Sequence, residues 1–249
     1  MNSYRRLCTE FYDIDKPRPP DDAYAFYRGR AEQVKGPILE PMCGSGRFLL
    51  PLLAAGFDID GMDASPEMLQ ACRLKAEARG LAPRLYEQFL HELELPRRYE
   101  LVMIPGGSFG LVIEPALVKE SLRRLHAHMS PGGTLILAIE RLMPDQPEEE
   151  PWGGRWVQRS DGARIVISRL TQFSAEERIS HSVHRYELIK DGQLLETEWE
   201  ELDLRLYEAG EFTALLEATG FTGIQMHGGY DLKPLEAVDD TIIYECRRA

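Results

Sequence analysis

The chain has 249 residues and carries a formal net charge of −12 at neutral pH. This acidic balance disfavours a nucleic-acid partner, because proteins that bind phosphates normally present a basic surface. The polar N-terminus, the lack of an apolar run near ~18 residues and four cysteines without paired spacing predict a cytoplasmic protein with no signal peptide, membrane anchor or disulfides.

The N-terminal residues predict two helices separated by a proline-rich loop. The first spans about 3–12, where apolar side chains recur at helical spacing after Ser3. The second spans about 23–34 and follows Asp21 or Asp22, either of which can cap it. The aromatic side chains of these helices can pack on a core or cover a ligand, and the pattern leaves both open.

Residues 38–63 predict a strand, a glycine turn, a helix and a second strand. Gly44 and Gly46 place two residues without a Cβ where a backbone must run close to a ligand. Pro51 falls inside the expected helix and predicts a kink or a late helix start. Asp63 ends the second strand roughly 20 residues after Glu40, the offset at which a nucleotide-binding unit presents a carboxylate to ribose.

The same turn discriminates between two kinds of nucleotide ligand. A dinucleotide-binding turn has a third small residue where this chain has Leu49, and a carboxylate at Glu40 would repel a pyrophosphate. Two carboxylates instead suit a phosphate-free ligand with a positive end and a ribose diol. A plain strand–turn–helix of some other α/β protein remains an alternative.

The segment Glu40-Pro-Met-Cys-Gly-Ser-Gly46 resembles the first motif of the class I S-adenosylmethionine-dependent methyltransferases. That motif runs acid, two residues, Cys or Gly, Gly, any residue, Gly. The resemblance implies that Glu40 holds the methionine end of S-adenosylmethionine, that Gly44 and Gly46 pass beneath it, and that Asp63 binds the ribose hydroxyls. Met42 departs from the family's usual glycine or alanine and would narrow the pocket beside the methionine moiety.

Residues 64–140 continue the alternation of helices and strands. We expect helices from Ser65-Pro66-Glu67 to Gly80 and over 114–129, and strands over 84–90, 100–105 and 134–140. The resemblance implies an adenine site lined by Ala64, Met68 and Leu90, and it places Pro105 beside the transferring methyl group. Phe89 stands where the family often has an acid for the adenine amino group, so this contact would fall to the Leu90 N–H or to Gln88.

Beyond 151 the periodicity changes from helical to alternating. Strands are expected over 155–160, 163–172, 179–190 and 193–206, with hairpin turns at Asp161-Gly162 and Asp191-Gly192. In the last strand Leu195 and Trp199 lie in one register and Leu202, Leu204 and Leu206 in the other, which predicts a bulge near Glu200. The family resemblance covers about 1–140 and 208–247, leaving this meander outside the shared core.

The predicted fold is therefore α/β: a Rossmann-like seven-stranded sheet with helices on both faces and an inserted antiparallel β meander. We expect an N-terminal helical lid at 1–36, because Phe11-Tyr12-Asp13 resembles the triplet that covers the cofactor in the family. The cofactor-binding core would comprise 37–143 and 208–249. The insert, at 152–207, would cap the substrate or form a dimer contact.

Methyl transfer from a sulfonium requires mainly that the protein align the nucleophile and exclude water. A base is optional, because an amine need only be neutral whereas a hydroxyl must lose its proton. Candidate catalytic residues are Tyr12, Glu140 and His184, with Tyr186 and His227 as further possibilities. We expect no metal site, because His181 and His184 would point to opposite faces of a strand.

Two functions stay open from the sequence. One is a methyltransferase that acts on an N or O atom of a small soluble molecule. The other is an S-adenosylmethionine-binding protein without transferase activity that oligomerises, for example as a homodimer, through the β insert. A nicotinamide-dependent reductase is disfavoured by Leu49 and Glu40.

Overall fold

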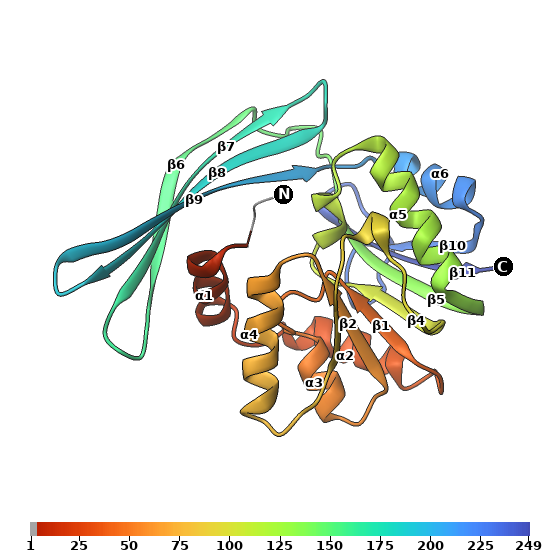
Figure 1. Cartoon of the computed structure of the whole chain (residues 1–249). Helices are drawn as coiled ribbons and strands as arrows, with labels where there is room; N and C mark the ends of the chain where they lie inside the picture. Colours follow the sequence, from red (N-terminus) through yellow and green to blue (C-terminus); the bar gives the residue numbers. More distant parts are fainter. Residues whose placement is uncertain (1–3) are drawn as a thin grey trace.

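The computed structural model describes residues 4–249 and contains two separate sheets (Figure 1). The larger has seven strands in the order β10-β11-β5-β4-β1-β2-β3. Strands β1 to β5 pair in parallel, whereas β11 pairs antiparallel with both β5 and β10. The bounds are β1 Ile38–Pro41, β2 Ile59–Asp63, β3 Arg84–Glu87, β4 Tyr99–Ile104, β5 Met129–Glu140, β10 Phe221–His227 and β11 Thr241–Arg248. This is the predicted Rossmann-like seven-stranded arrangement.

Helices cover both faces of this sheet. One face packs against α5 and α6 through residues such as Val102 and Ile104 of β4, and the other packs against α2, α3 and α4 through Leu101 and Met103. The apolar run of β4 is thus buried on both sides, as predicted for a central strand. The bounds are α2 Asp21–Ala31, α3 Leu49–Ala54, α4 Pro66–Glu77, α5 Pro115–His128 and α6 Ala209–Thr219. Within residues 4–249 no helix is long and apolar enough to cross a membrane.

The helices that follow β1 and β2 begin as their sequences predicted. Helix α3 starts late, at Leu49, so Pro51 lies in its first turn, where backbone N–H groups have no partner inside the helix and the proline removes no bond. Helix α4 has Ser65 as its N-cap, whose hydroxyl accepts the Met68 N–H at 3.1 Å, and Pro66 as its first residue. Both helices therefore begin at the carboxyl edge of the sheet.

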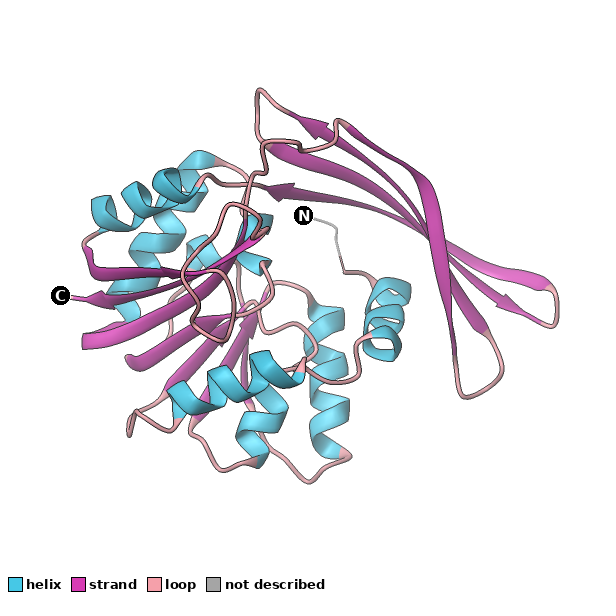
Figure 2. Ribbon diagram, turned by 180° about the vertical axis from the view of Figure 1, so that it is seen from behind, coloured by secondary structure: helices cyan, strands magenta, loops and turns pink. Residues whose placement is uncertain are grey.

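The smaller sheet is the predicted antiparallel meander, in the order β6-β7-β8-β9. It lies beside α1 (Arg6–Asp15) and extends away from the large sheet (Figures 1 and 2). Asp191 and Gly192 both have positive φ, as a two-residue hairpin turn requires. Its first strand begins at Glu149 rather than near 155. The bounds are β6 Glu149–Gln158, β7 Arg164–Ser174, β8 Ile179–Lys190 and β9 Gln193–Arg205.

The predicted bulge near Glu200 is wrong. Glu200 pairs in regular register with His184, and the register shifts near the hairpin instead, where Leu195 is the extra residue. From Glu196 onward the side chains of β9 alternate without interruption. Glu196, Glu198 and Glu200 therefore lie on the same face as Leu202 and Leu204. The apolar pattern predicted the bulge wrongly because part of the inward face of β9 is acidic. Trp199 lies on the opposite, outward face and is 51% exposed.

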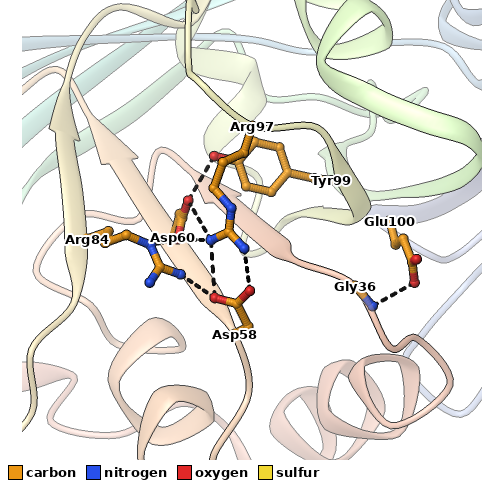
Figure 3. Close-up of polar contacts among 7 residues, drawn as sticks. All are labelled: Gly36, Asp58, Asp60, Arg84, Arg97, Tyr99 and Glu100. Atoms are coloured by element: carbon orange, nitrogen blue, oxygen red, sulfur yellow. Dashed lines mark hydrogen bonds and ion pairs between the residues drawn. The ribbon is translucent and has the colours of Figure 1, made fainter.

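A polar cluster closes the amino-terminal ends of the central strands (Figure 3). Asp60 is fully buried and accepts hydrogen bonds from Tyr99 Oη at 2.9 Å, Arg84 Nε at 2.6 Å and Arg97 Nη1 at 3.0 Å. Asp58 pairs with both arginines, which lowers its pKa. A buried carboxylate needs such partners, so this cluster ties β2, β3 and β4 together at the edge opposite the glycine turn.

Candidate active site

The turn after β1 is built from three residues with left-handed backbone. Met42, Gly44 and Gly46 have φ of 58°, 54° and 83°. The value at Met42 is uncommon for a residue with a side chain and explains why glycine would be the easier choice there. The amide of Cys43 donates to the Met62 carbonyl at 3.0 Å, which fixes the turn at the carboxyl ends of β1 and β2.

The two glycines of the turn have different roles. A Cβ at Gly44 would meet little, with Met68 Sδ at 3.7 Å, and Gly44 lines a cavity. A Cβ at Gly46 would lie 2.6 Å from Cys72 Sγ and 2.9 Å from Leu50 Cγ, so this glycine lets the turn pack on α4. The structure therefore places Gly46 behind the cavity rather than in its wall.

Glu40 lies at the carboxyl end of β1 and is 2% exposed. Burial, and secondly the charge of Asp63, hold its pKa well above the usual range, while the backbone N–H of Leu49 and the charge of Arg47 act in the opposite direction. Its Oε2 is buried, and no described residue donates to it. A buried carboxylate oxygen without a donor is costly, so Glu40 is poised for a cationic or N–H-bearing ligand.

Asp63 ends the neighbouring strand and is held by two backbone amides. Its Oδ2 accepts the Gly44 N–H at 2.7 Å, and its Oδ1 accepts the Ser65 N–H at 2.9 Å. Burial raises its pKa and these amides counteract the rise. Since a carboxylate can accept about four hydrogen bonds, acceptor capacity remains for hydroxyl donors.

A cavity of about 760 Å³ opens over both acids. Most residues predicted to bind a cofactor line it: Glu40, Met42, Gly44, Asp63, Ala64, Met68, Phe89, Leu90 and Pro105. Gly46 is the predicted residue that does not. A volume of this size falls within the range of about 300–1,000 Å³ that holds cofactor-sized ligands.

Several lining residues were not identified from the sequence. Lys16 and Arg47 approach Tyr12, with Lys16 Nζ 5.3 Å from its ring centroid and Arg47 Nη1 donating to its hydroxyl at 3.4 Å. Tyr230 reaches the cavity from the loop between β10 and β11 and packs on Phe26, with ring centroids 5.5 Å apart. No local pattern marks these residues, because tertiary packing alone brings them to the site.

At the other end of the cavity, the segment after β3 contributes Gln88, Phe89 and Leu90. The side chain of Gln88 is engaged at both ends by the backbone of Glu94, donating to its carbonyl at 3.1 Å and accepting its N–H at 2.9 Å. Phe89 stacks on His91 with centroids 5.5 Å apart. An apolar and aromatic wall of this kind suits a flat heterocycle.

Of the three predicted catalytic candidates, Tyr12 lines the cavity and the other two do not. Glu140 packs behind the backbone of Gly107, where an added Cβ would lie 2.8 Å from its Oε1. His184 is buried in the meander, and its Nδ1 lies 3.5 Å from the Tyr186 hydroxyl. The structure thus places Glu140 and His184 outside the lining of the cavity, because a strand pattern predicts the strand but not the direction of its side chains.

Comparison with known proteins identifies the segment that carries this site. Residues 38–133 match the family model described as "Methyltransferase domain". A protein of Geobacillus sp. (strain WCH70) named as a methyltransferase is 28% identical over 102 residues, which cover 41% of each chain. The chain thus spans about two fifths of the length of that curated relative.

Solved structures match the fold over nearly the whole chain. An S-adenosylmethionine-dependent methyltransferase from Clostridium acetobutylicum ATCC 824 has a TM-score of 0.80 at 19% identity, covering 99% of both chains. The sugar N-methyltransferase KedS8 from Streptoalloteichus sp ATCC 53650 has a TM-score of 0.79 at 17% identity, covering 100% of this chain and 96% of that one. The likeness includes the meander, which corrects the expectation that it lies outside the shared fold.

The chain therefore has the fold of S-adenosylmethionine-dependent methyltransferases. The cavity described above fits S-adenosylmethionine chemically. It presents an unpartnered buried carboxylate oxygen at Glu40, free acceptor positions at Asp63 and a stacking wall at Phe89. These correspond to an ammonium group, a ribose diol and an adenine ring.

Proposed function

We propose that the protein is an S-adenosylmethionine-dependent methyltransferase that methylates an N or O atom of a small molecule. The observation that carries this proposal is the buried carboxylate of Glu40, which lines the same cavity as Asp63 and whose Oε2 has no donor among the described residues. Two acids flanking a cavity would repel the pyrophosphate of a dinucleotide and attract a cationic adenosine compound. The cofactor would supply the activated methyl group when bound.

The cofactor would be held by residues of the domain's carboxyl edge. Glu40 would bind the α-ammonium group, Asp63 the ribose hydroxyls, and Ala64, Met68 and Leu90 the adenine. The backbone of Gly44 would pass under the cofactor, with Met42 and Pro105 near its methionine end. All of the residues assigned here line the same cavity.

The acceptor would enter beside Tyr12 and Lys16, where the N-terminal helix meets the cavity. Burial raises the pKa of Tyr12, so its hydroxyl stays protonated and can orient an acceptor by hydrogen bonding. Burial, and secondly the charge of Arg47, lower the pKa of Lys16. An amine acceptor would need only to be neutral and aligned, so exclusion of water by α1 would suffice for the reaction.

The small-molecule substrate class is supported by the cavity and by one structural neighbour. The neighbour KedS8 is a sugar N-methyltransferase, and its fold covers this entire chain. The cavity is enclosed by α1 and the glycine turn and has the volume of a cofactor-sized ligand with limited additional space. A small amine or hydroxyl compound is therefore the acceptor class we favour.

The homodimer expected from the sequence would use the outer face of the meander. All three tryptophans of the chain lie there and are each about half exposed: Trp152 49%, Trp156 52% and Trp199 51%. Arg185 lies between the rings of Trp152 and Trp199, 5.5 and 5.6 Å from their centroids. Interfaces are enriched in such tryptophan and arginine contacts. Sedimentation of the wild type and of Trp199→Glu tests this, and a monomeric wild type would refute it.

Product formation tests the proposed activity directly. The protein would be incubated with isotopically labelled S-adenosylmethionine and a panel of amines, aminosugars and phenols, and methylated products would be read by mass spectrometry. We expect turnover of at least one small amine or hydroxyl compound, and loss of turnover in Glu40→Gln. Cofactor binding without turnover of any panel member would favour the alternative of a binding protein.

A thermal-shift comparison tests the cofactor class. S-adenosylhomocysteine should raise the melting temperature of the wild type, because a ligand that binds the folded state stabilises it. NADH should leave it unchanged. A response to NADH alone would overturn the assignment.

A further inference from the structure

Helix α1 lacks a cap from its own sequence. Its N-cap residue is Arg5, and within the described chain the Arg5 side chain makes no capping hydrogen bond. The first N–H groups of a helix need acceptors from elsewhere. Glu198 of β9 provides one at Leu7, and Glu200 accepts the N–H groups of Arg5 and Tyr4 just ahead of the helix, although the two glutamates are 191 to 196 residues away in sequence.

These two residues, Glu198 and Glu200, form what we call the β9 cap. Glu200 accepts the Arg5 N–H at 2.5 Å and the Tyr4 N–H at 3.2 Å, one with each carboxylate oxygen. Glu198 accepts the Leu7 N–H at 2.8 Å. Negative side chains at this end also interact favourably with the helix dipole.

The cap and the helix depend on each other. Glu200 is 4% exposed, and a carboxylate so buried is costly unless it accepts hydrogen bonds. Burial raises its pKa, and the N–H groups of Arg5 and Tyr4 are among the contacts that counteract the rise. Withdrawal of the helix would therefore remove these donors from Glu200, and the hydrogen bonds that would be lost favour the docked position of α1.

The docked helix reaches the cavity at both of its ends. Tyr4 and Arg5 line the cavity ahead of the helix, and Tyr12 and Lys16 line it at the other end. The Tyr4 carbonyl accepts the Ser65 hydroxyl at 3.0 Å, and the Ser65 N–H donates to Asp63 at 2.9 Å. A continuous series of hydrogen bonds thus leads from Glu200 to the acid assigned to the ribose.

The far end of α1 is tied to the glycine turn. Asp13 Oδ1 accepts the Ser45 hydroxyl at 2.5 Å and pairs with Lys75 Nζ at 2.6 Å. The helix therefore bridges the meander on one side and the turn and α4 on the other. Its position over the cavity is set jointly by these two attachments.

We infer that Glu198 and Glu200 are positioning residues for cofactor binding, acting from outside the cavity by holding α1 closed over it. The inference rests on the proposed function, because it assigns the closed helix to the cofactor. The inference gives the meander a role in every turnover, because this sheet carries the two glutamates that hold α1 in place. This role is separate from any contact that the meander makes with a second copy of the chain. Neither glutamate lines the cavity, so the effect of Glu200 passes through Tyr4 and Arg5 and that of Glu198 through Leu7.

The chain offers a matched control on the same strand and face. Glu196 is also a glutamate on the inward face of β9, two residues before Glu198, and it contacts α1 through the side chain of Arg6 in an exposed ion pair. Exposed ion pairs contribute little to the stability of a protein. Glu196→Gln should therefore leave cofactor affinity unchanged within about twofold.

The experiment measures binding of S-adenosylhomocysteine by calorimetry together with hydrogen exchange of the peptide that contains residues 4–10. Glu200→Ala should raise the dissociation constant by about tenfold, the scale of losing charged hydrogen bonds, and speed exchange of the amides of Tyr4, Arg5 and Leu7. Glu200→Gln keeps one acceptor oxygen and should fall between the wild type and Glu200→Ala. Glu198→Gln, which alters a single contact, serves if Glu200→Ala does not fold.

The outcomes separate this inference from the proposed function. If the wild type binds and Glu200→Ala behaves as Glu196→Gln does in both measurements, the inference is overturned. Faster exchange with unchanged affinity would also overturn it, because the cap would then hold the helix without serving the ligand. If the wild type itself binds no S-adenosylhomocysteine, the proposed function fails and the role in cofactor binding fails with it, whereas exchange still reports whether the cap exists.

Discussion

The amide of Gly44 donates to Asp63 Oδ2 at 2.7 Å, joining the glycine turn to the end of β2. The acid is therefore fixed in orientation by the same backbone that would pass under a cofactor. Preorganisation of this kind lowers the entropic cost of binding. The remaining acceptor positions of Asp63 are the ones assigned to the ribose hydroxyls.

Replacing Asp63 should weaken cofactor binding. We expect Asp63→Ala to reduce the affinity for S-adenosylhomocysteine by about 1–3 kcal/mol, the scale of losing charged hydrogen bonds. Titration calorimetry measures this directly. Asp58→Ala is the control, since Asp58 precedes the same strand at its opposite end and pairs with Arg84 and Arg97. Unchanged affinity in Asp63→Ala would refute the ribose assignment.

Replacing Glu40 should have opposite effects on stability and on binding. The folded-state pKa of Glu40 is raised by burial, so the stability that its protonation contributes is fully present below the unfolded pKa and lost as pH rises through the folded pKa. Glu40→Gln, which cannot ionise, should therefore be more stable at neutral pH than the wild type measured without added ligand. Denaturant unfolding at pH 4 and pH 8 measures this, and the difference should vanish at the lower pH.

The affinity of the same variant for S-adenosylhomocysteine should fall by tenfold or more, on the order expected for loss of a buried charge pair. A variant that is less stable than the wild type at pH 8 and binds equally well would contradict the role given to Glu40. A variant that is more stable and binds poorly is the expected signature of a group whose burial serves a ligand rather than the fold.

Cofactor affinity should depend on pH through Glu40. A bound ammonium group favours the ionised carboxylate, so binding releases a proton wherever Glu40 is still protonated in the free protein. Affinity for S-adenosylhomocysteine should rise with pH through the raised pKa of Glu40 and level off above it. Calorimetry in buffers of different ionisation enthalpy would report the released proton. In Glu40→Gln the Glu40-dependent part of the rise should disappear; an identical pH profile in both proteins would exclude Glu40 as its source.

Gly46 should tolerate alanine less well than Gly56, although both have positive φ. Their φ values are 83° and 91°, but a Cβ at Gly46 would meet Cys72 and Leu50 whereas one at Gly56 would meet open space. Gly56→Ala should cost about 1 kcal/mol from backbone strain alone, and Gly46→Ala clearly more, through overpacking. Chemical denaturation of the two variants measures the difference. Equal costs would show that packing on α4 is not what requires glycine at 46.

The sequence predicted the parts of this protein that depend on local patterns. The glycine turn, the cap at Ser65 and the apolar run of β4 each follow from neighbouring residues, and each lies where expected. Glu40 and Asp63 were located because strand ends at one edge of a parallel sheet must lie close together.

The rest depended on tertiary packing. Tyr230 enters the cavity from a loop near the C-terminus, and no spacing in the sequence connects it with Tyr12. His184 and Glu140 were placed on the correct strands, but a strand pattern does not determine which side chains reach a cavity formed elsewhere. The bulge of β9 was misplaced because the leucine pattern does not reveal that the inward face also carries glutamates, two of which accept N–H groups at the start of α1.

A crystal structure of the protein with S-adenosylhomocysteine would test the central claim most directly. The account predicts the α-amino group within hydrogen-bonding distance of Glu40 Oε2 and both ribose hydroxyls on the carboxylate of Asp63, with α1 closed over the ligand. A ligand bound away from this cavity, or either carboxylate turned away from it, would contradict the account.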